Sequence, residues 1–240
     1  IILRNLKQLD SFEWIVKYSN STEFSIKWKL NSIFVLVGKS GFGKTTLLDM
    51  FFGLIGQESC RWKLNCGDND YYLNSYEAYE FLNNNVAYST QNPYLFEGTL
   101  RENILLNKIN NLNEYENSEI ERKIYEWFSS LELEHLLDRY GNVLDLELGK
   151  ILESFSKGEI RRIGLIRTWI QDKPIEILDE PTAFLDESVA RKISNIIIKR
   201  SKSKFILLTT HDKKLINIGK KIFKLRRSDH HEIVKFHYQN

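Results

Sequence analysis

A glycine-rich segment followed by a lysine and a threonine indicates chemistry most directly in this sequence. It runs Gly-Lys-Ser-Gly-Phe-Gly-Lys-Thr over residues 38–45 and fits the pattern G-x-x-x-x-G-K-[ST] at every required position. Glycines let successive main-chain N–H groups turn inward around an anion, and the N-terminus of a following helix adds partial positive charge. Lys44 would reach the β- and γ-phosphates of a nucleotide, and the Thr45 hydroxyl would ligate Mg²⁺. The sequence therefore predicts a phosphate-binding loop (P-loop).

Two carboxylates at the end of an expected strand supply the second chemical element. Residues 175–178 are typical of a buried strand, and Asp179 and Glu180 follow it directly. Because ligands of parallel sheets bind at the carboxyl ends of the strands, these acids are expected to face the P-loop. Asp179 would then coordinate Mg²⁺, and Glu180 would polarise an attacking water as general base. The alternative is two acids that only cap the strand.

The elements that must position these residues alternate along the chain. Residues 22–37 alternate in polarity and then become continuously apolar, which predicts an edge strand followed by a strand buried on both faces. A helix is expected to follow the P-loop as far as residue 55. Further strands are expected at 86–89, 175–178 and 205–210, and further helices at 118–140, 159–170 and 187–199. This alternation predicts an α/β fold with a mostly parallel sheet. The Asn-rich residues 107–117 are expected to form a solvated loop.

Composition excludes several classes of protein. The 240 residues carry 34 Lys and Arg against 32 Asp and Glu, so the formal net charge is only +2. Binding to nucleic acid through the overall electrostatic field is therefore not expected. No run approaches the roughly 18–20 apolar residues of a membrane span. The two cysteines, Cys60 and Cys66, have neither a disulfide framework nor zinc-ligand spacing around them.

Four further segments stand in order around the P-loop and the acid pair. They are residues 90–104 (TQNPYLFEGTLRENI), residues 155–159 (FSKGE) leading into Arg161-Arg162, residues 183–186 (AFLD) and residues 210–212 (THD). They resemble, in turn, the Q-loop, the LSGGQ signature, the D-loop and the switch histidine of the nucleotide-binding domains of ABC transporters, particularly exporters. The resemblance covers residues 10–225, which is nearly the whole chain.

The resemblance implies an ABC ATPase fold. This fold is a P-loop NTPase core with a mostly parallel sheet, an antiparallel β edge subdomain and a helical lobe. Residues 1–240 would form a single nucleotide-binding domain. Its RecA-like core would span about 1–90 and 160–240, and its helical lobe about 92–160.

The resemblance also implies how the residues act. Two such domains are expected to close head to tail around two ATP molecules, with the P-loop of one facing the signature of the other. Gln91 would sense the γ-phosphate and Mg²⁺ and couple the site to a membrane domain. His211 would contact the γ-phosphate and orient the attacking water with Glu180. Ser156 and Gly158 would reach the γ-phosphate of the ATP held by the partner.

The remaining contacts complete the expected site. Adenine is expected to stack on Tyr18, with Trp14 as the alternative, and Asp186 would bridge the two sites across the dimer. The expected catalytic residues are Glu180, His211 and Gln91. The expected nucleotide-binding residues are Tyr18, Gly38, Lys39, Ser40, Gly41, Phe42, Gly43, Lys44, Thr45, Thr46, Ser156, Gly158 and Asp186. The expected Mg²⁺ ligands are Thr45, Gln91 and Asp179.

Several positions depart from the family pattern. In the signature, Phe155, Lys157 and Glu159 stand where Leu, Gly and Gln are usual. Lys150 reverses a charge where exporters usually carry a Gly-Glu segment. The D-loop has Ala183-Phe184 where Ser-Ala is commoner. These changes leave nucleotide binding in place and bear on the hydrolysis rate and the coupling.

The expected function is an ATP-hydrolysing motor domain that dimerises, as a homodimer, to power export across a membrane. A chain that begins Ile1-Ile2 without Met favours a transmembrane domain on the same full-length chain, and hence a position at the cytoplasmic face of a membrane. The alternatives are the ATPase subunit of an ABC importer and a soluble ABC-type ATPase of DNA maintenance. The near-neutral charge and the lack of sustained heptads over 56–154 disfavour the second alternative and a nucleic-acid partner.

Overall fold

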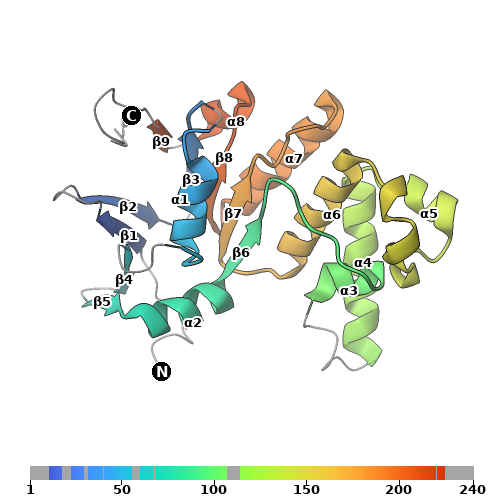
Figure 1. Cartoon of the computed structure of the whole chain (residues 1–240), viewed down its shortest axis with the longest axis horizontal. Helices are drawn as coiled ribbons and strands as arrows, with labels where there is room; N and C mark the ends of the chain where they lie inside the picture. Colours follow the sequence, from blue (N-terminus) through green and yellow to red (C-terminus); the bar gives the residue numbers. More distant parts are fainter. Residues whose placement is uncertain are drawn as a thin grey trace. The chain divides into compact units, whose positions relative to one another are not determined.

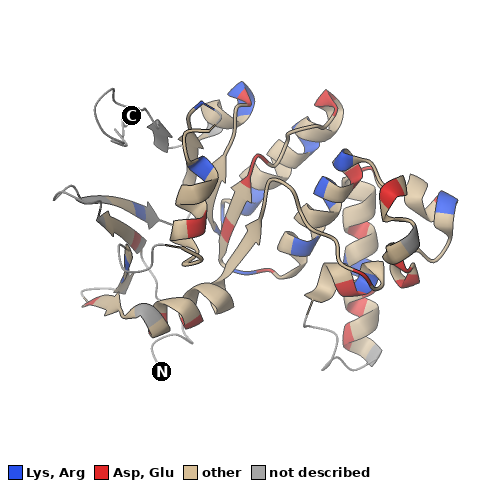
Figure 2. Ribbon diagram, in the orientation of Figure 1, with Lys and Arg blue, Asp and Glu red and all other residues tan. Residues whose placement is uncertain are grey.

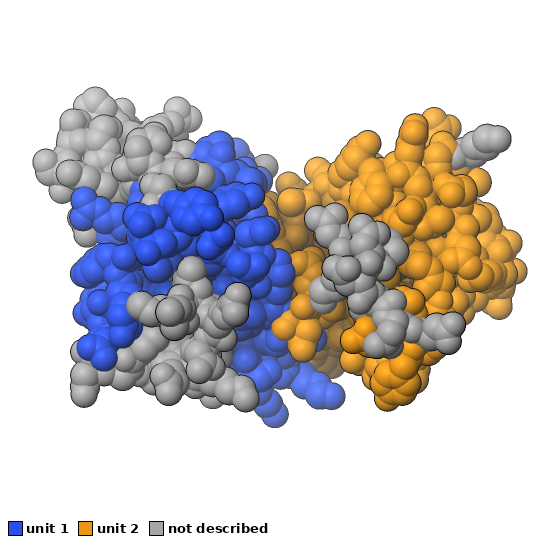
Figure 3. Space-filling model, turned by 90° about the horizontal axis from the view of Figure 1, so that it is seen from below, with its two compact units in different colours: residues 1–86, 173–177, 198–240 blue, residues 87–172, 178–197 orange. Residues whose placement is uncertain are grey.

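The chain divides into two compact units, coloured separately in Figure 3. The structure, a computed structural model, describes residues 11–17, 23–29, 32–39, 41–55, 60–66, 69–106, 114–219 and 221–224. Unit 1 comprises residues 1–86, 173–177 and 198–240, and unit 2 comprises residues 87–172 and 178–197. The P-loop and the switch histidine therefore belong to unit 1, whereas the Q-loop, the signature, the acid pair and the D-loop belong to unit 2.

An antiparallel sheet forms one part of unit 1 (Figure 1). Its strands, in the order β2-β1-β4-β5, are β2 (Glu23–Lys29), β1 (Ser11–Lys17), β4 (Cys60–Cys66) and β5 (Asn69–Leu73). Trp14 on β1 lies opposite Ile26 on one neighbour and Trp62 on the other, and all three are buried. Because side chains alternate between the faces of a strand, this register gives the sheet one apolar face. The expected antiparallel β edge is confirmed.

The second sheet has the strand order β6-β7-β8-β3-β9. The strands are β6 (Val86–Ser89), β7 (Ile175–Asp179), β8 (Phe205–Thr209), β3 (Ser32–Val37) and β9 (Lys221–Lys224). Strand β3 pairs in parallel with both β8 and β9, and its four central residues are buried. A strand with two hydrogen-bonded neighbours and two covered faces must be apolar throughout, which is why its sequence does not alternate. The expected α/β fold with a parallel sheet is confirmed.

Three helices of unit 1 flank these strands in the sequence. They are α1 (Lys44–Phe51), α2 (Ser75–Asn85) and α8 (Lys213–Ile218). Helix α2 begins with a capping box, in which the Asn74 side chain accepts from Glu77 N and the Glu77 carboxylate accepts from Asn74 N. The aromatic ring of Phe51, in the last turn of α1, packs edge to face against Trp14 at 5.2 Å between centroids. This contact ties the P-loop helix to the antiparallel sheet.

Unit 2 is built mainly of helices. They are α3 (Leu100–Leu105), α4 (Glu114–Ser130), α5 (His135–Tyr140), α6 (Lys157–Ile170) and α7 (Glu187–Arg200), whose last residues belong to unit 1. Three short 3₁₀ turns, Val143–Asp145, Leu148–Lys150 and Leu152–Ser154, connect α5 to α6. Helix α6 packs against α3 and α4 (Figure 1). Within the described ranges, no helix has both the length and the apolar composition of a membrane span.

Part of the Asn-rich segment does not form the expected loop. Residues 107–113 lie outside the described residues, whereas residues 114–117 belong to α4. The first turn of α4 is exposed where it is described, so a polar sequence is compatible with a helix there. The polar composition was therefore a poor guide to the start of this helix.

A buried ion pair lies within unit 1 and joins β7 to the end of α7. The Glu176 side chain is fully buried, and Arg200 Nε lies 3.0 and 3.1 Å from its two carboxylate oxygens. A carboxylate without solvent needs such charged donors, because an unpaired buried charge is strongly destabilising. The pair therefore explains how an acid is tolerated in the middle of a buried strand.

We expect Arg200→Met to lower the free energy of unfolding by about 3–5 kcal/mol, because it leaves the Glu176 charge buried without its partner. Urea denaturation measures the change. The double variant Glu176→Met/Arg200→Met should recover most of the loss, since it removes both charges. Arg191→Met on the same helix is the control, because Arg191 forms an exposed pair with Glu187. An Arg200→Met effect as small as that of Arg191→Met would contradict the prediction.

Candidate nucleotide-binding site

The P-loop in unit 1 has the backbone that its glycines predict. It connects β3 to α1, and Gly41 and Gly43 both have φ +79°. This left-handed conformation is strained for residues with a side chain, so glycine is required at both positions. The N–H of Phe42 donates to the carbonyl of Lys39 at 3.2 Å and closes the turn. Ser40 lies outside the described residues.

The structure brings two of the predicted residues of unit 1, Lys44 and His211, into contact. The Lys44 ammonium donates to the carbonyl of Gly38 at 2.8 Å and to that of Lys39 at 3.4 Å, and it lies 3.2 Å from His211 Nε2. An ammonium has no acceptor, so the imidazole must accept through an unprotonated Nε2. Phosphate oxygens are stronger acceptors than these partners, because they are charged. The phosphates of a bound nucleotide could therefore replace the two carbonyls and His211 as hydrogen-bond partners of the Lys44 ammonium.

The oxygen donors predicted for Mg²⁺ suit this ion. Thr45 and Thr46 are exposed in the first turn of α1 in unit 1, whereas Asp179 is buried and Gln91 half-buried in unit 2. Hydroxyl, amide and carboxylate oxygens are hard ligands of the kind that Mg²⁺ prefers. In the described part of the chain, no cluster of three or more His, Cys, Asp or Glu could hold a metal unaided.

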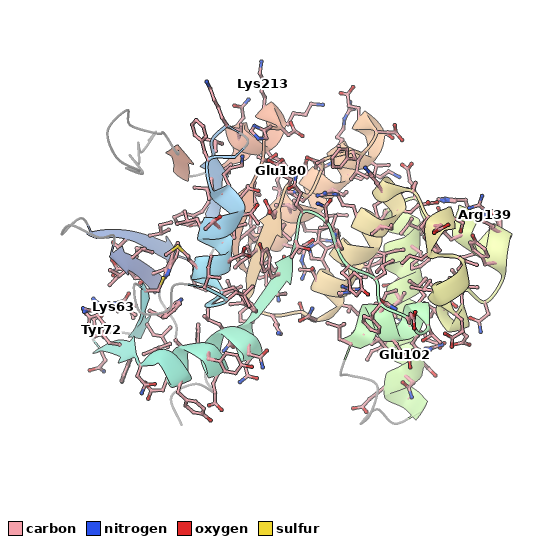
Figure 4. All side chains as sticks on the ribbon, in the orientation of Figure 1. Lys63, Tyr72, Glu102, Arg139, Glu180 and Lys213 are labelled. Atoms are coloured by element: carbon pink, nitrogen blue, oxygen red, sulfur yellow. The ribbon has the colours of Figure 1, made fainter. Side chains whose placement is uncertain are left out.

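The acid pair lies where β7 ends, in unit 2. Asp179 is 1% exposed and Glu180 is 8% exposed, so both carboxylates are largely shielded from water. Glu180, labelled in Figure 4, has φ +49°, a conformation that is rare for residues other than glycine. Its carbonyl accepts from the N–H of Ala183 at 3.1 Å, which turns the chain toward the D-loop. The general base expected from the sequence therefore stands on an unusual backbone that needs support.

Arg161 on α6 supplies that support and was missed as a site residue by the sequence analysis. Its guanidinium donates to the main-chain carbonyls of Asp179, Glu180 and Gln91, the first at 3.3 Å. Burial lowers the pKa of Arg161, and the nearby carboxylates of Asp179 and Glu180 oppose that effect. Arg161 thus joins the Q-loop to the acid pair within unit 2. The sequence did contain a signal for this role. Arg161 is a charged residue one helical turn before Leu165, and therefore lies on the buried face of α6.

A buried asparagine fixes the segment that follows Gln91. The Asn103 side chain accepts from the N–H of Phe96 at 2.9 Å and donates to the carbonyls of Phe96 and Thr99. Arg167 on α6 donates to the carbonyl of Asn103 at 2.7 Å. At the start of α3, Glu102, labelled in Figure 4, forms a capping box with Thr99. These contacts hold residues 94–103 against α6, which carries a series of basic residues along its length (Figure 2).

Ser156 and Gly158 of the signature lie at the start of α6. The Ser156 hydroxyl accepts from the N–H of Glu159 at 3.1 Å, and the Glu159 carboxylate accepts from the N–H of Ser156 at 2.6 Å. Because a serine hydroxyl has one hydrogen of its own, Ser156 can cap the helix and still donate to a phosphate. A side chain at Gly158 would lie 3.3 Å from both the Phe184 carbonyl and the Leu185 side chain, so glycine lets the D-loop approach.

Glu159, which replaces the usual Gln, makes one further contact. His135 Nε2 lies 2.6 Å from the Glu159 carboxylate, and the Glu159 side chain is only 9% exposed. Burial opposes ionisation of Glu159, but the hydrogen bonds from His135 and Ser156 outweigh it and lower the pKa of this carboxyl. The substitution therefore preserves the capping box and adds a contact to α5.

Two other departures from the family pattern contact each other. The Phe184 ring has the Lys157 ammonium 5.9 Å from its centroid and the Arg161 guanidinium 5.6 Å from it. Such cation–π contacts favour an aromatic side chain beside two cations. Phe184 has φ +63° and is 65% exposed. The signature and the D-loop thus present Lys157 and Phe184 side by side at the surface of unit 2.

The residues expected to contact adenine or to bridge the two sites are described only in part. Tyr18 lies outside the described residues, so the adenine contact stays a prediction. Trp14, the alternative, is fully buried against Phe51 and has no surface for a base to stack on. Asp186 is exposed, and its carbonyl accepts from the N–H of Ala190 in the first turn of α7.

Comparison with known proteins assigns the family. The sequence profile described as ABC transporter matches residues 22–183, so the chain belongs to the ABC transporter family. The part of the family that it represents is the ATP-binding domain, as the P-loop, signature and D-loop together require. The expected relationship to ABC transporters is confirmed.

Several proteins that are similar in sequence are named as transport proteins. The chain is 29% identical over 176 residues to the glutathione/L-cysteine transport system ATP-binding/permease protein CydC of Haemophilus influenzae, covering 73% of this chain and 28% of that protein. It is 31% identical over 180 residues to the ATP-dependent lipid A-core flippase of Vibrio vulnificus, with coverage of 73% and 28%. The nisin transport ATP-binding protein NisT of Lactococcus lactis is 28% identical over 216 residues, with coverage of 87% and 34%.

A solved structure shares the fold. It is described as a bacterial Atm1-family ABC exporter with ATP bound, and the TM-score is 0.71 at 20% identity, covering 91% of this chain and 37% of that one. The chain thus spans 28% to 37% of the length of these four proteins.

The Glu159 contacts predict a pH-dependent stability. Because the folded-state pKa lies below the ordinary value of 4.5, the contribution of Glu159 is present above pH 4.5 and is lost as the pH falls through the folded-state pKa. We therefore expect Glu159→Gln to be less stable than the wild type at neutral pH, with a difference that shrinks as the pH falls below 4.5. Urea denaturation at a series of pH values measures it. A difference that is constant over this range would contradict the assignment.

Proposed function

We propose that this chain is the ATP-hydrolysing motor domain of an exporter and that it works as a dimer closed around two ATP molecules. The observation that carries the proposal is the acid pair at the end of β7, whose second member, Glu180, has the buried carboxylate of a general base. The contact between Lys44 and His211 in the P-loop region supports it further. The names of the relatives, which include a flippase and an ATP-binding/permease protein, favour export over the importer and DNA-maintenance alternatives.

The chemistry follows from the residues of the chain. The P-loop N–H groups and the Lys44 ammonium bind the phosphates, and Lys44 leaves the carbonyls of Gly38 and Lys39 to do so. Glu180 accepts a proton from water as the water oxygen attacks the γ-phosphorus, and ADP leaves with its β-phosphate oxygen. His211, no longer held by Lys44, turns its ring to the γ-phosphate and the water. Thr45, Gln91 and Asp179 are the residues that would hold Mg²⁺, which would supply charge neutralisation to the phosphates.

A second nucleotide-binding domain completes the proposed site. Ser156, exposed at the start of α6, donates its hydroxyl hydrogen to the γ-phosphate of the ATP held by the other copy, and Gly158 brings its main chain close to the same group. Lys157 adds a cation beside them. Because phosphoryl transfer depends mainly on positioning and charge stabilisation, a site divided between two copies is inactive until they close.

The proposal extends to the assembly. The chain forms a homodimer as a single nucleotide-binding domain with a RecA-like core and a helical lobe. Gln91 couples its site to a transmembrane domain on the same full-length protein, at the cytoplasmic face of a membrane. Nucleic acid is not a partner. The ATP-binding/permease name of CydC, of which the matched residues cover only 28%, supports this arrangement.

We expect the protein to release phosphate from Mg-ATP, and Glu180→Gln to slow release by about a hundredfold or more, because it removes the base. The same variant should retain ATP and accumulate as a dimer, measured by light scattering after size exclusion. Glu187→Gln is the matched control, since Glu187 lies in the same region of unit 2 with an exposed carboxylate. Phosphate release that is no faster in the wild type than in Glu180→Gln would sink the proposed function.

A further inference from the structure

We propose that Arg161 is a positioning residue for ATP hydrolysis, which holds the main chain of Glu180 and Gln91 in the conformation that the reaction needs. The inference rests on the proposed function, in which the side chains of these two residues act on the attacking water and the γ-phosphate. Arg161 would touch neither water nor nucleotide. It would act through the carbonyls that it binds.

The contacts of Arg161 fit this role because they join two separate loops. One terminal nitrogen of the guanidinium serves the carbonyls of Asp179 and Glu180, and the other serves the carbonyl of Gln91, 70 residues before Arg161 in the sequence. These carbonyls lie where β7 ends and where the Q-loop begins. A planar guanidinium can bind in two directions at once, which an ammonium cannot.

The backbone of Glu180 shows why such support is needed. Its φ of +49° costs free energy for a residue with a side chain, and such a conformation persists only when its surroundings hold it. Arg161 donates to the carbonyl of this residue and is itself 3% exposed, so its position is fixed by packing. A rigid donor at this point sets where the Glu180 carboxylate lies.

The Phe184 ring extends this network to the surface of unit 2. It lies 5.6 Å from the Arg161 guanidinium and is 65% exposed, in the D-loop that a second copy is proposed to meet. A displacement of the D-loop would therefore disturb the group that holds Glu180 and Gln91. Through Arg161, closure of the dimer would therefore change the position of Glu180, the proposed catalytic base.

The neighbouring arginine provides a matched control. Arg162 is also on α6 and half-buried, and it donates to the carbonyls of Gly158, Leu131 and Glu132. None of these carbonyls belongs to the Q-loop or the acid pair. Loss of Arg162 therefore removes a comparable number of hydrogen bonds from the same helix without touching Glu180 or Gln91.

The test is steady-state phosphate release by the full-length protein as a function of ATP concentration. Arg161→Met should lower kcat roughly 10- to 100-fold, because a displacement of about 1 Å at a reacting group costs that much. The KM for ATP should stay within about twofold, since the P-loop contacts are made by unit 1. Arg161→Lys should recover part of kcat, because an ammonium can reach one of the two loops. Arg162→Met should lower the melting temperature as Arg161→Met does, yet keep kcat within about twofold of the wild type.

A double variant separates positioning from a loss of fold. Because Arg161 acts in part through Glu180, adding Arg161→Met to Glu180→Gln should slow phosphate release by a smaller factor than Arg161→Met slows the wild type. Equal losses of kcat in Arg161→Met and Arg162→Met, or a further equal loss in the double variant, would overturn the inference. If Glu180→Gln abolishes release and Arg161→Met does not change kcat, the inference alone is refuted. A wild-type rate equal to that of Glu180→Gln refutes the proposed function and this inference with it.

Discussion

Several charged groups of this protein are buried in or beside strands, and each of them needs a polar partner there. All five residues of β7 are buried, and the strand ends in a carboxylate. The cost of an unpaired buried charge exceeds most single stabilising interactions. Lys44 meets this requirement with the carbonyls of its own loop and with His211, and Arg161 meets it with carbonyls from the Q-loop and the acid pair. In each unit, the polar contacts that stabilise the buried charges are thus also the contacts that position the expected site residues.

The departures from the family signature have a structural explanation. Glu159 forms the same capping box that a glutamine could form, and its charge gains a contact with His135. Lys157 and Phe184, each unusual alone, contact one another at the surface of unit 2. Ser156 caps α6, and Gly158 leaves room for the D-loop main chain. A signature segment whose sequence departs from the family pattern can therefore still form specific contacts in the folded chain.

The sequence predicted the P-loop, β3, β7 and the fold class, because a motif or a continuous apolar run is a local signal. It did not identify β1, β4 and β5 as strands of one sheet, since that sheet depends on pairing between segments about 50 residues apart, such as Ser11 and Asn65. Arg161 was overlooked for the same reason. Its partner Gln91 is 70 residues distant, and nothing local to α6 indicates which carbonyls the guanidinium reaches. Long-range polar contacts are thus the part of the site that sequence reasoning could not supply.

A mixing experiment tests most directly whether the site is shared between two copies. Lys44→Ala damages the P-loop, and Ser156→Asp places a negative charge against the phosphate while keeping a good N-cap for α6. Each variant alone should release no phosphate, because both sites of its dimer are damaged. A mixture of the two variants should release phosphate, since a mixed dimer contains one undamaged site. Ser156→Asn, an uncharged cap, should retain more activity than Ser156→Asp. A mixture no more active than the sum of its two components would contradict the shared site.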